Sequence, residues 1–211
     1  MVLDIESSNP TSNAANLIID TGQKLTTQLV ANTDIFGIFI SKDAIVVPQS
    51  NIFSIEYLFK RPINLKGDEL ISGFMAGTSN EEGVVVGAVS VGDEKNSGPT
   101  SMVMTNPSSE LIPQGSNIEE AAVENIRVGI YYNQNTKKIG SIINGVNKGY
   151  QWTYTTPLNN FKFLIGVEIR RLVGVNNYPI GQNVSYEIIS DHSKMQFNYP
   201  SGTTDICGTV I

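Results

Sequence analysis

The sequence has few of the residues on which most catalytic and metal centres depend. It contains one cysteine, Cys207, so no disulfide can form within the chain, and one histidine, His192. A structural zinc site takes four ligands, almost all of them Cys or His, and these two residues cannot supply it. We therefore expect no metal and no cofactor, a free thiol at Cys207 and a polar turn around His192.

Charge is also scarce. Charged residues make up 16% of the chain, below the roughly one quarter of an ordinary soluble domain. The 20 acidic residues outnumber the 14 basic ones, which argues against nucleic acid or an anionic membrane as partner, because phosphates select basic surfaces. The polar surface must come from residues such as the 21 asparagines. With 19 glycines, this composition is typical of turn-rich β proteins.

Long apolar runs are missing. No window approaches the 18 or so apolar residues of a membrane-spanning helix. Residues 1–23 lack the basic region and apolar core of a signal peptide. We therefore expect a chain made in a cytoplasm, or a processed fragment with an added start Met. Together with a composition like that of extracellular β proteins, this suggests a virion protein. We therefore expect it at a virion or extracellular surface.

Short apolar segments separated by turn residues dominate the rest of the chain. Residues 51–59 alternate, with Phe53, Ile55, Tyr57 and Phe59 on one face of a strand. One short helix is expected over 117–124, where acidic residues follow a capping residue. The remaining pattern predicts strands at 27–31, 35–40, 70–75, 83–91, 102–105, 126–132, 138–143, 146–152, 161–169, 184–189 and 195–199.

This pattern predicts one all-β domain. Its expected architecture is an antiparallel two-sheet jelly-roll sandwich with at most one short helix. Residues 1–24 include a cluster of Ser, Asn and Pro, which predicts an N-terminal extended arm or loop. The sandwich itself is expected to span residues 25–211.

The clearest local signal lies at residues 126–150. Asn144-Gly145 predicts a type I′ hairpin turn, which needs positive φ at both central positions. With the polar turn at 133–137, it indicates a three-stranded meander. The segments 128–133, 138–146 and 149–150 resemble the meander of concanavalin A-like and SPRY-like sandwiches.

Two further segments extend this resemblance. Residues 163–167 are similar to the strand that follows after a loop in that family, and 51–62 are similar to the opening strand of laminin G-like modules. The resemblance implies a jelly roll of the kind found in lectins and in phage tail or capsid proteins. The legume-lectin cluster of Asp, Asn and His in adjacent loops has no counterpart, which puts calcium-dependent sugar binding in doubt.

A glycosidase on this fold would need two carboxylates facing each other across a cleft. No strand carries acids two apart on one face. Glu56 and Glu168 each lie alone in an apolar strand, where we expect an outward-facing side chain. His192 lies among Ser and Asp neighbours in a turn, and adjacent turn residues do not form a triad. The sequence therefore predicts no enzyme.

The remaining candidates are aromatic and polar side chains that suit sugar binding, because sugar rings stack on Tyr and Trp. If residues 150–154 are extended, their three aromatic residues share one face beside the Asn144-Gly145 turn. The competing interpretation is that Trp152 packs in the core or at the sheet edge and does not contact a ligand. The residues expected to bind ligand are Tyr150, Trp152, Tyr154, Asn144, Tyr131 and Arg170.

Together these observations favour a non-enzymatic binding module of a virion or cell surface that recognises a host glycan or surface receptor. The alternative is a structural assembly protein, such as a capsid decoration or tail-associated domain, whose partners are neighbouring virion subunits. A glycan hydrolase is a third and weaker option. Whether the chain forms a homo-oligomer stays open.

Overall fold

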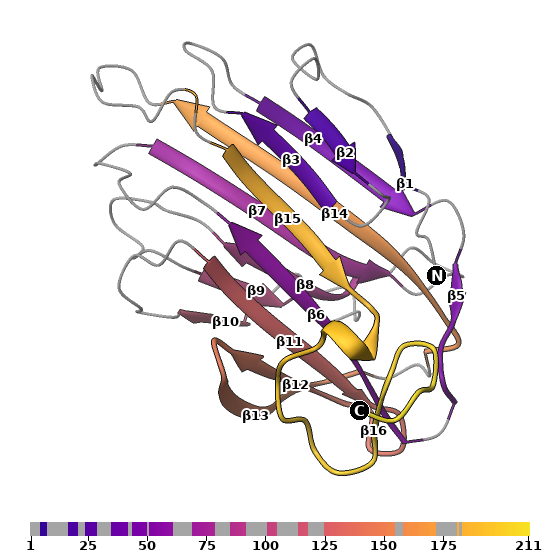
Figure 1. Ribbon diagram of the computed structural model, residues 1–211. Helices are drawn as coiled ribbons and strands as arrows, with labels where there is room; N and C mark the ends of the chain where they lie inside the picture. The colour runs from indigo at the N-terminus through magenta and orange to yellow at the C-terminus, as the bar shows by residue number, and fades with distance from the viewer. Residues whose placement is uncertain are drawn as a thin grey trace.

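The computed structural model describes residues 5–7, 17–20, 24–28, 35–41, 44–49, 51–60, 69–78, 85–91, 101–104, 114–117, 125–154, 158–171, 181 and 183–211. Within them, the chain forms two large antiparallel sheets, as Figure 1 shows. The prediction of an all-β jelly-roll sandwich is confirmed.

The first sheet has the strand order β1-β4-β14-β7-β8, and β5 also pairs with β14. Its bounds are β1 Ile5–Ser7, β4 Ile35–Ser41, β5 Ile45–Val46, β7 Glu69–Thr78, β8 Val85–Val91 and β14 Asn160–Arg171.

The second sheet has the order β13-β12-β11-β6-β15-β3-β2, and β16 pairs with β6 in parallel. Its bounds are β2 Leu17–Asp20, β3 Lys24–Gln28, β6 Ile52–Lys60, β11 Asn125–Asn133, β12 Lys138–Ile143, β13 Val146–Thr153, β15 Asn183–Ile189 and β16 Thr203–Asp205. β9 (Ser101–Met104) and β10 (Gln114–Asn117) form a separate two-stranded sheet.

The core lies between the two large sheets and is rich in aromatic rings. Phe53 stacks on Tyr132 at 4.8 Å between ring centroids, and both rings contact Phe161 from β14. The alternation predicted for β6 is therefore correct, since Phe53, Ile55, Tyr57 and Phe59 are all buried. At about 25 cal/mol for each Å² of apolar surface buried, rings of this size contribute much of the folding free energy.

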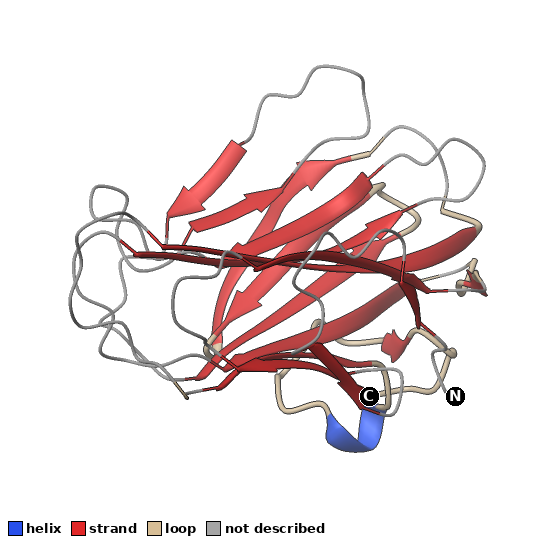
Figure 2. Cartoon of the chain, turned by 90° about the horizontal axis from the view of Figure 1, so that it is seen from above, coloured by secondary structure: helices blue, strands red, loops and turns tan. Residues whose placement is uncertain are grey.

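The C-terminal segment, residues 190–211, covers the outer face of the second sheet, the face turned away from the core. It begins with a 3-10 helix at His192–Lys194, whose N-cap is Asp191. Figure 2 shows this short helix outside the strands and near the C-terminus. The polar turn expected around His192 is thus confirmed.

Residues 195–199 do not form the predicted strand and follow an irregular path instead. The reason is that the amide groups of Gln196 and Phe197 donate to a carboxylate, Glu56, and not to a neighbouring strand. The last strand of the chain is β16.

Two predictions near the N-terminus and at the expected helix fall partly outside the described residues. Residues 5–7 and 17–20, within the expected arm, pair with β4 and β3. The division of the chain at residue 24 otherwise stays a prediction. Asn117 ends β10, and residues 118–124 of the expected helix are not described.

Candidate functional site

The meander of β11, β12 and β13 forms one edge of the second sheet, and its turns follow the predicted chemistry. Asn144 and Gly145 have φ values of 45° and 86°, as a type I′ turn requires. The Asn144 Oδ1 atom accepts a hydrogen bond of 2.9 Å from the Arg127 amide. Asn144 is exposed, but this oxygen already holds the turn against β11.

Three tyrosines gather on the outer face of the meander and the C-terminal segment. We call Tyr131, Tyr150 and Tyr199 the tyrosine cluster. The Tyr131 ring meets Tyr150 edge-on at 5.1 Å and Tyr199 edge-on at 6.2 Å between centroids. Tyr131 is buried, whereas Tyr150 is 41% exposed. Tyr150 is therefore the ring of this cluster that a ligand can reach.

Two asparagine side chains fix the orientation of these rings. Tyr131 donates from its hydroxyl to Asn147 Oδ1 at 3.0 Å, and Asn133 Nδ2 donates to the Tyr150 hydroxyl at 3.1 Å. Asn133 is itself held, since its Oδ1 accepts from the amides of Asn135 and Thr136. The exposed ring thus has a preset orientation with an amide at its hydroxyl end.

Glycines provide the space in which the buried rings lie. A Cβ atom at Gly140 would overlap the Tyr131 ring, and one at Gly129 would overlap Tyr199 and Phe197. A strand glycine of this kind marks a close approach by another group. Here it lets the aromatic rings come close to the strand backbone.

The prediction that the aromatics of residues 150–154 share one face is wrong for Tyr154. A bulge in the β12–β13 pairing places Gly140 opposite Tyr150 but Ile139 opposite Trp152. One extra residue reverses the alternation beyond it. Tyr154 is consequently buried, and its hydroxyl donates to Gln134 Oε1 at 2.7 Å.

Trp152 and Arg170 are placed only by their backbones. Trp152 pairs with Ile139 in β13, and its side chain lies outside the described part of the chain. Arg170 pairs with Leu70 in the first sheet. Arg170, which was expected to bind ligand together with residues of the meander, belongs instead to the other large sheet, because the chain crosses to that sheet after β13.

Glu56 is the site residue whose environment the sequence did not reveal. Its side chain lies on the outer face of the sheet, as expected, but it is fully buried beneath the C-terminal segment. Its Oε1 accepts from the amides of Gln196 and Phe197 and from the Tyr199 hydroxyl at 2.9, 3.0 and 3.2 Å. Its Oε2 pairs with Arg127 Nη1. A buried carboxylate with four donors anchors the covering segment.

The same anchor affects the ionisation of the Tyr199 hydroxyl. Burial first, and then the negative charge of Glu56, raise the pKa of Tyr199 above its ordinary value. Burial likewise raises the pKa of Tyr131, with a further contribution from Tyr150. Both hydroxyls are therefore neutral donors at physiological pH.

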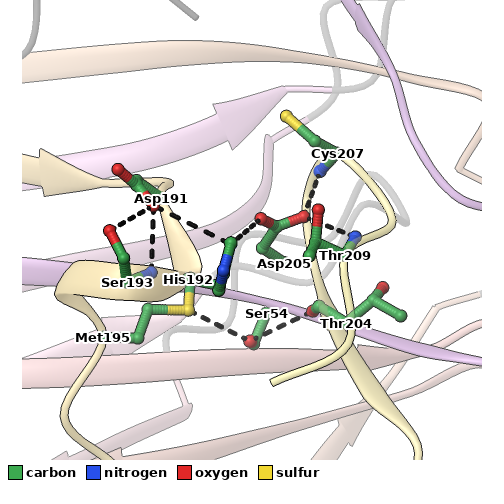
Figure 3. Close-up of polar contacts among 9 residues, drawn as sticks. All are labelled: Ser54, Asp191, His192, Ser193, Met195, Thr204, Asp205, Cys207 and Thr209. Carbon is green, nitrogen blue, oxygen red and sulfur yellow. Dashed lines mark hydrogen bonds and ion pairs between the residues drawn. The ribbon is translucent and has the colours of Figure 1, made fainter.

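A second polar group lies at the base of the C-terminal segment (Figure 3). His192 Nδ1 lies 3.3 Å from Asp205 Oδ2, while Asp205 Oδ1 accepts from the amides of Cys207 and Thr209. The Cys207 thiol is free and exposed, and Figure 3 shows its sulfur pointing away from Asp205. Burial and the Asp205 charge raise the pKa of Cys207. This arrangement closes a turn and does not activate a nucleophile.

Neither a metal-binding cluster nor a membrane-spanning helix is found among the described residues. No group of three or more His, Cys, Asp and Glu side chains there is placed to hold a metal ion. No helix in the part of the chain that the structure covers is long and apolar enough to cross a membrane.

Solved structures share this arrangement of strands. The carbohydrate recognition domain of Emp46p superposes with a TM-score of 0.57 over 89% of this chain and 88% of that domain, at 8% identity. The Bacillus licheniformis β-glucanase gives 0.53 over 88% and 90%, at 13% identity. A PL7 alginate lyase from Zobellia galactanivorans gives 0.50 over 86% and 81%, at 16% identity.

The fold is therefore a concanavalin A-like jelly roll, a class that includes both lectin domains and polysaccharide-cleaving enzymes. The chain belongs to the family described as domain of unknown function DUF4882, whose model matches residues 93–209. That range contains the meander and nearly all of the C-terminal segment. No curated protein matches the chain.

Proposed function

We propose that this protein is a non-enzymatic glycan-binding module and that the tyrosine cluster is its binding face. The observation that carries the proposal is the exposed, oriented ring of Tyr150, with Asn133 at its hydroxyl and Asn147 close by on the same face. A flat aromatic face beside amide groups suits the apolar C–H surface and the hydroxyls of a sugar ring. The fold shared with a carbohydrate recognition domain agrees with this reading.

Among the described side chains of this face, no acid is paired with another across the tyrosine cluster, which supports binding without hydrolysis. Glycoside hydrolysis needs two carboxyl groups flanking the bond that breaks. Among the described side chains, the carboxylate that touches the tyrosine cluster is Glu56, which is buried and paired with Arg127. It has neither access to solvent nor an acidic partner there.

The setting that we propose is a virion or cell surface. The support is compositional: a chain with 16% charged residues and 21 asparagines presents an amide-rich and hydroxyl-rich surface. Such surfaces are common where a module meets a host glycan or receptor outside the cell.

The test is glycan-array binding by the wild type and by Tyr150→Ala. We expect wild-type binding to a defined glycan set, and a loss of about tenfold or more in affinity for Tyr150→Ala. Tyr150→Phe keeps the ring and should retain binding within a few-fold. Val146→Ala removes another exposed side chain from the same strand and serves as the matched control.

Three outcomes would overturn the proposal. These are no binding to any glycan, unchanged binding by Tyr150→Ala, and release of reducing sugar from the bound glycan. A melting temperature within a few degrees of wild type for Tyr150→Ala separates lost binding from lost folding.

A further inference from the structure

The charges of the meander differ from those of the remaining chain. Residues 125–154 contain Arg127, Lys137, Lys138 and Lys148 and not one Asp or Glu. All 20 acidic residues lie elsewhere in a chain of net charge −6. The segment that carries the exposed tyrosine therefore has a net positive charge, in a protein whose net charge is negative.

Two of these lysines flank Tyr150 along the strands. Lys138 pairs with Asn133 on one side and with Thr153 on the other. Because side chains two residues apart share a face, Lys138 lies on the face of Tyr131 and Tyr150. Lys148 lies two residues before Tyr150, at a bulge where Gly149 pairs with Ser141 and Asn147 with Ile142. Both lysines are exposed.

The Asp and Glu side chains that the structure describes are Glu56, Glu187, Asp191 and Asp205, and none of them lies in the meander. Glu56 is already paired with Arg127. Asp205 lies in β16, which pairs with the edge of β6 opposite to β11. Asp191 lies beside His192, which contacts Asp205, so it is also beyond β6.

We propose that the ligand of the tyrosine cluster is an acidic glycan, whose sugar ring stacks on Tyr150 and whose carboxylate or sulfate groups face Lys138 and Lys148. This proposal rests on the proposed glycan-binding function and specifies its ligand class. A polymer of negative charge would be repelled by the rest of an acidic protein, so local cations decide where it can bind. Stacking on Tyr150 and attraction of the acidic groups to the two lysines then supply separate parts of the affinity.

The experiment uses an array of saccharides printed in pairs that share linkage and length. One member of each pair carries the neutral C6 hydroxymethyl group and the other a C6 carboxylate. We expect the wild type to bind the acidic member with about tenfold higher affinity at low salt. The reason is that each exposed ion pair raises the affinity about threefold. The preference should shrink as salt rises, because exposed charges are screened.

Variants assign the preference to the two lysines. The double substitution Lys138→Gln/Lys148→Gln should bind both members of a pair equally and keep the neutral-sugar affinity of the wild type. Lys194→Gln removes an exposed lysine from the 3-10 helix, outside the meander, and should retain the full preference. Tyr150→Ala should bind neither the neutral nor the acidic saccharide of a pair.

The outcomes separate the two proposals. Equal binding of neutral and acidic members by the wild type, or an unchanged preference in the double variant, would overturn the acidic ligand and leave glycan binding standing. Binding of neither member would overturn both. Binding of a single-stranded DNA oligonucleotide as tightly as the acidic saccharide, with loss in the double variant, would reassign the lysines to nucleic acid and overturn the acidic-glycan inference.

Discussion

Tyr199 donates a hydrogen bond to Glu56 across 3.2 Å, although the two residues are 143 positions apart in the sequence. The contact joins the C-terminal segment to the middle of the second sheet. Since Tyr199 also packs on Tyr131, which packs on Tyr150, the carboxylate supports the exposed ring through two intervening side chains. The contribution of this contact to the free energy of unfolding can be tested directly.

Substitution of Glu56 by Ala should destabilise the protein by about 3–5 kcal/mol. The change leaves Arg127, two amides and a tyrosine hydroxyl without their acceptor, and removing one partner of a buried ion pair has a cost of this size. Urea denaturation gives the free energy of unfolding. Glu187→Gln, a partly exposed carboxylate on β15, should change it by less than about 1 kcal/mol. An equally small effect at Glu56 would contradict the anchoring role.

Substitution of Gly140 by Ala should cost about 1–3 kcal/mol, because the added methyl group overlaps the Tyr131 ring. The double variant Gly140→Ala/Tyr131→Ala should lose less than the sum of its single substitutions. That difference is the coupling free energy of a double-mutant cycle. Additive losses would show that Tyr131 does not occupy the space above Gly140.

The buried tyrosines of the core should respond in opposite directions when their hydroxyls are removed. The hydroxyls of Tyr57 and Tyr132 are buried and have no hydrogen-bond partner. Tyr57→Phe and Tyr132→Phe should therefore be neutral or stabilise by about 1 kcal/mol. Tyr154→Phe, which loses its bonds to Asn133 and Gln134, should destabilise by about 1 kcal/mol. Thermal unfolding of the three variants checks the contrast, and a loss in all three would refute it.

Stability should fall as pH rises above 10. Burial raises the pKa of five of the eight tyrosines above the ordinary value of 10.0, namely Tyr57, Tyr131, Tyr132, Tyr154 and Tyr199. Above that pH the unfolded chain loses protons that the folded chain keeps, so the free energy of unfolding decreases with pH. This stability is fully present below pH 10.

The urea midpoint, measured at neutral pH and stepwise above pH 10, follows this effect. Tyrosinate absorbance should rise together with unfolding and not before it. Tyr199→Phe should lessen the slope of the midpoint with pH, because one of the late-ionising groups is gone. A midpoint that is flat across this range would contradict the prediction.

The local features of the meander were predictable from sequence, whereas the covering of its sheet was not. Asn144-Gly145 and the alternation of β6 and β11 depend on neighbouring residues, and local chemistry decides them. The burial of Glu56 depends on a segment about 140 residues further along. A single glutamate in an apolar strand gives no sign of such a partner.

The binding residues were predictable in part for the same reason. Tyr150 and Tyr131, both predicted to bind ligand, lie together. The prediction for Tyr154 failed because it assumed that strand alternation continues through β13. A bulge changes the count by one residue, and a single sequence does not reveal where the partner strand skips. Arg170 was misplaced because proximity along the chain does not show which sheet a strand joins.

The bulge at the end of β13 has a consequence for how this surface can vary. Deletion of Gln151 would remove the bulge and leave Tyr150 outward and Tyr154 inward in simple alternation, with loss of the hydrogen bond that Gln151 Oε1 accepts from Ser141 Oγ. A length change of one residue at this position would therefore leave Tyr150 as the solvent-facing ring.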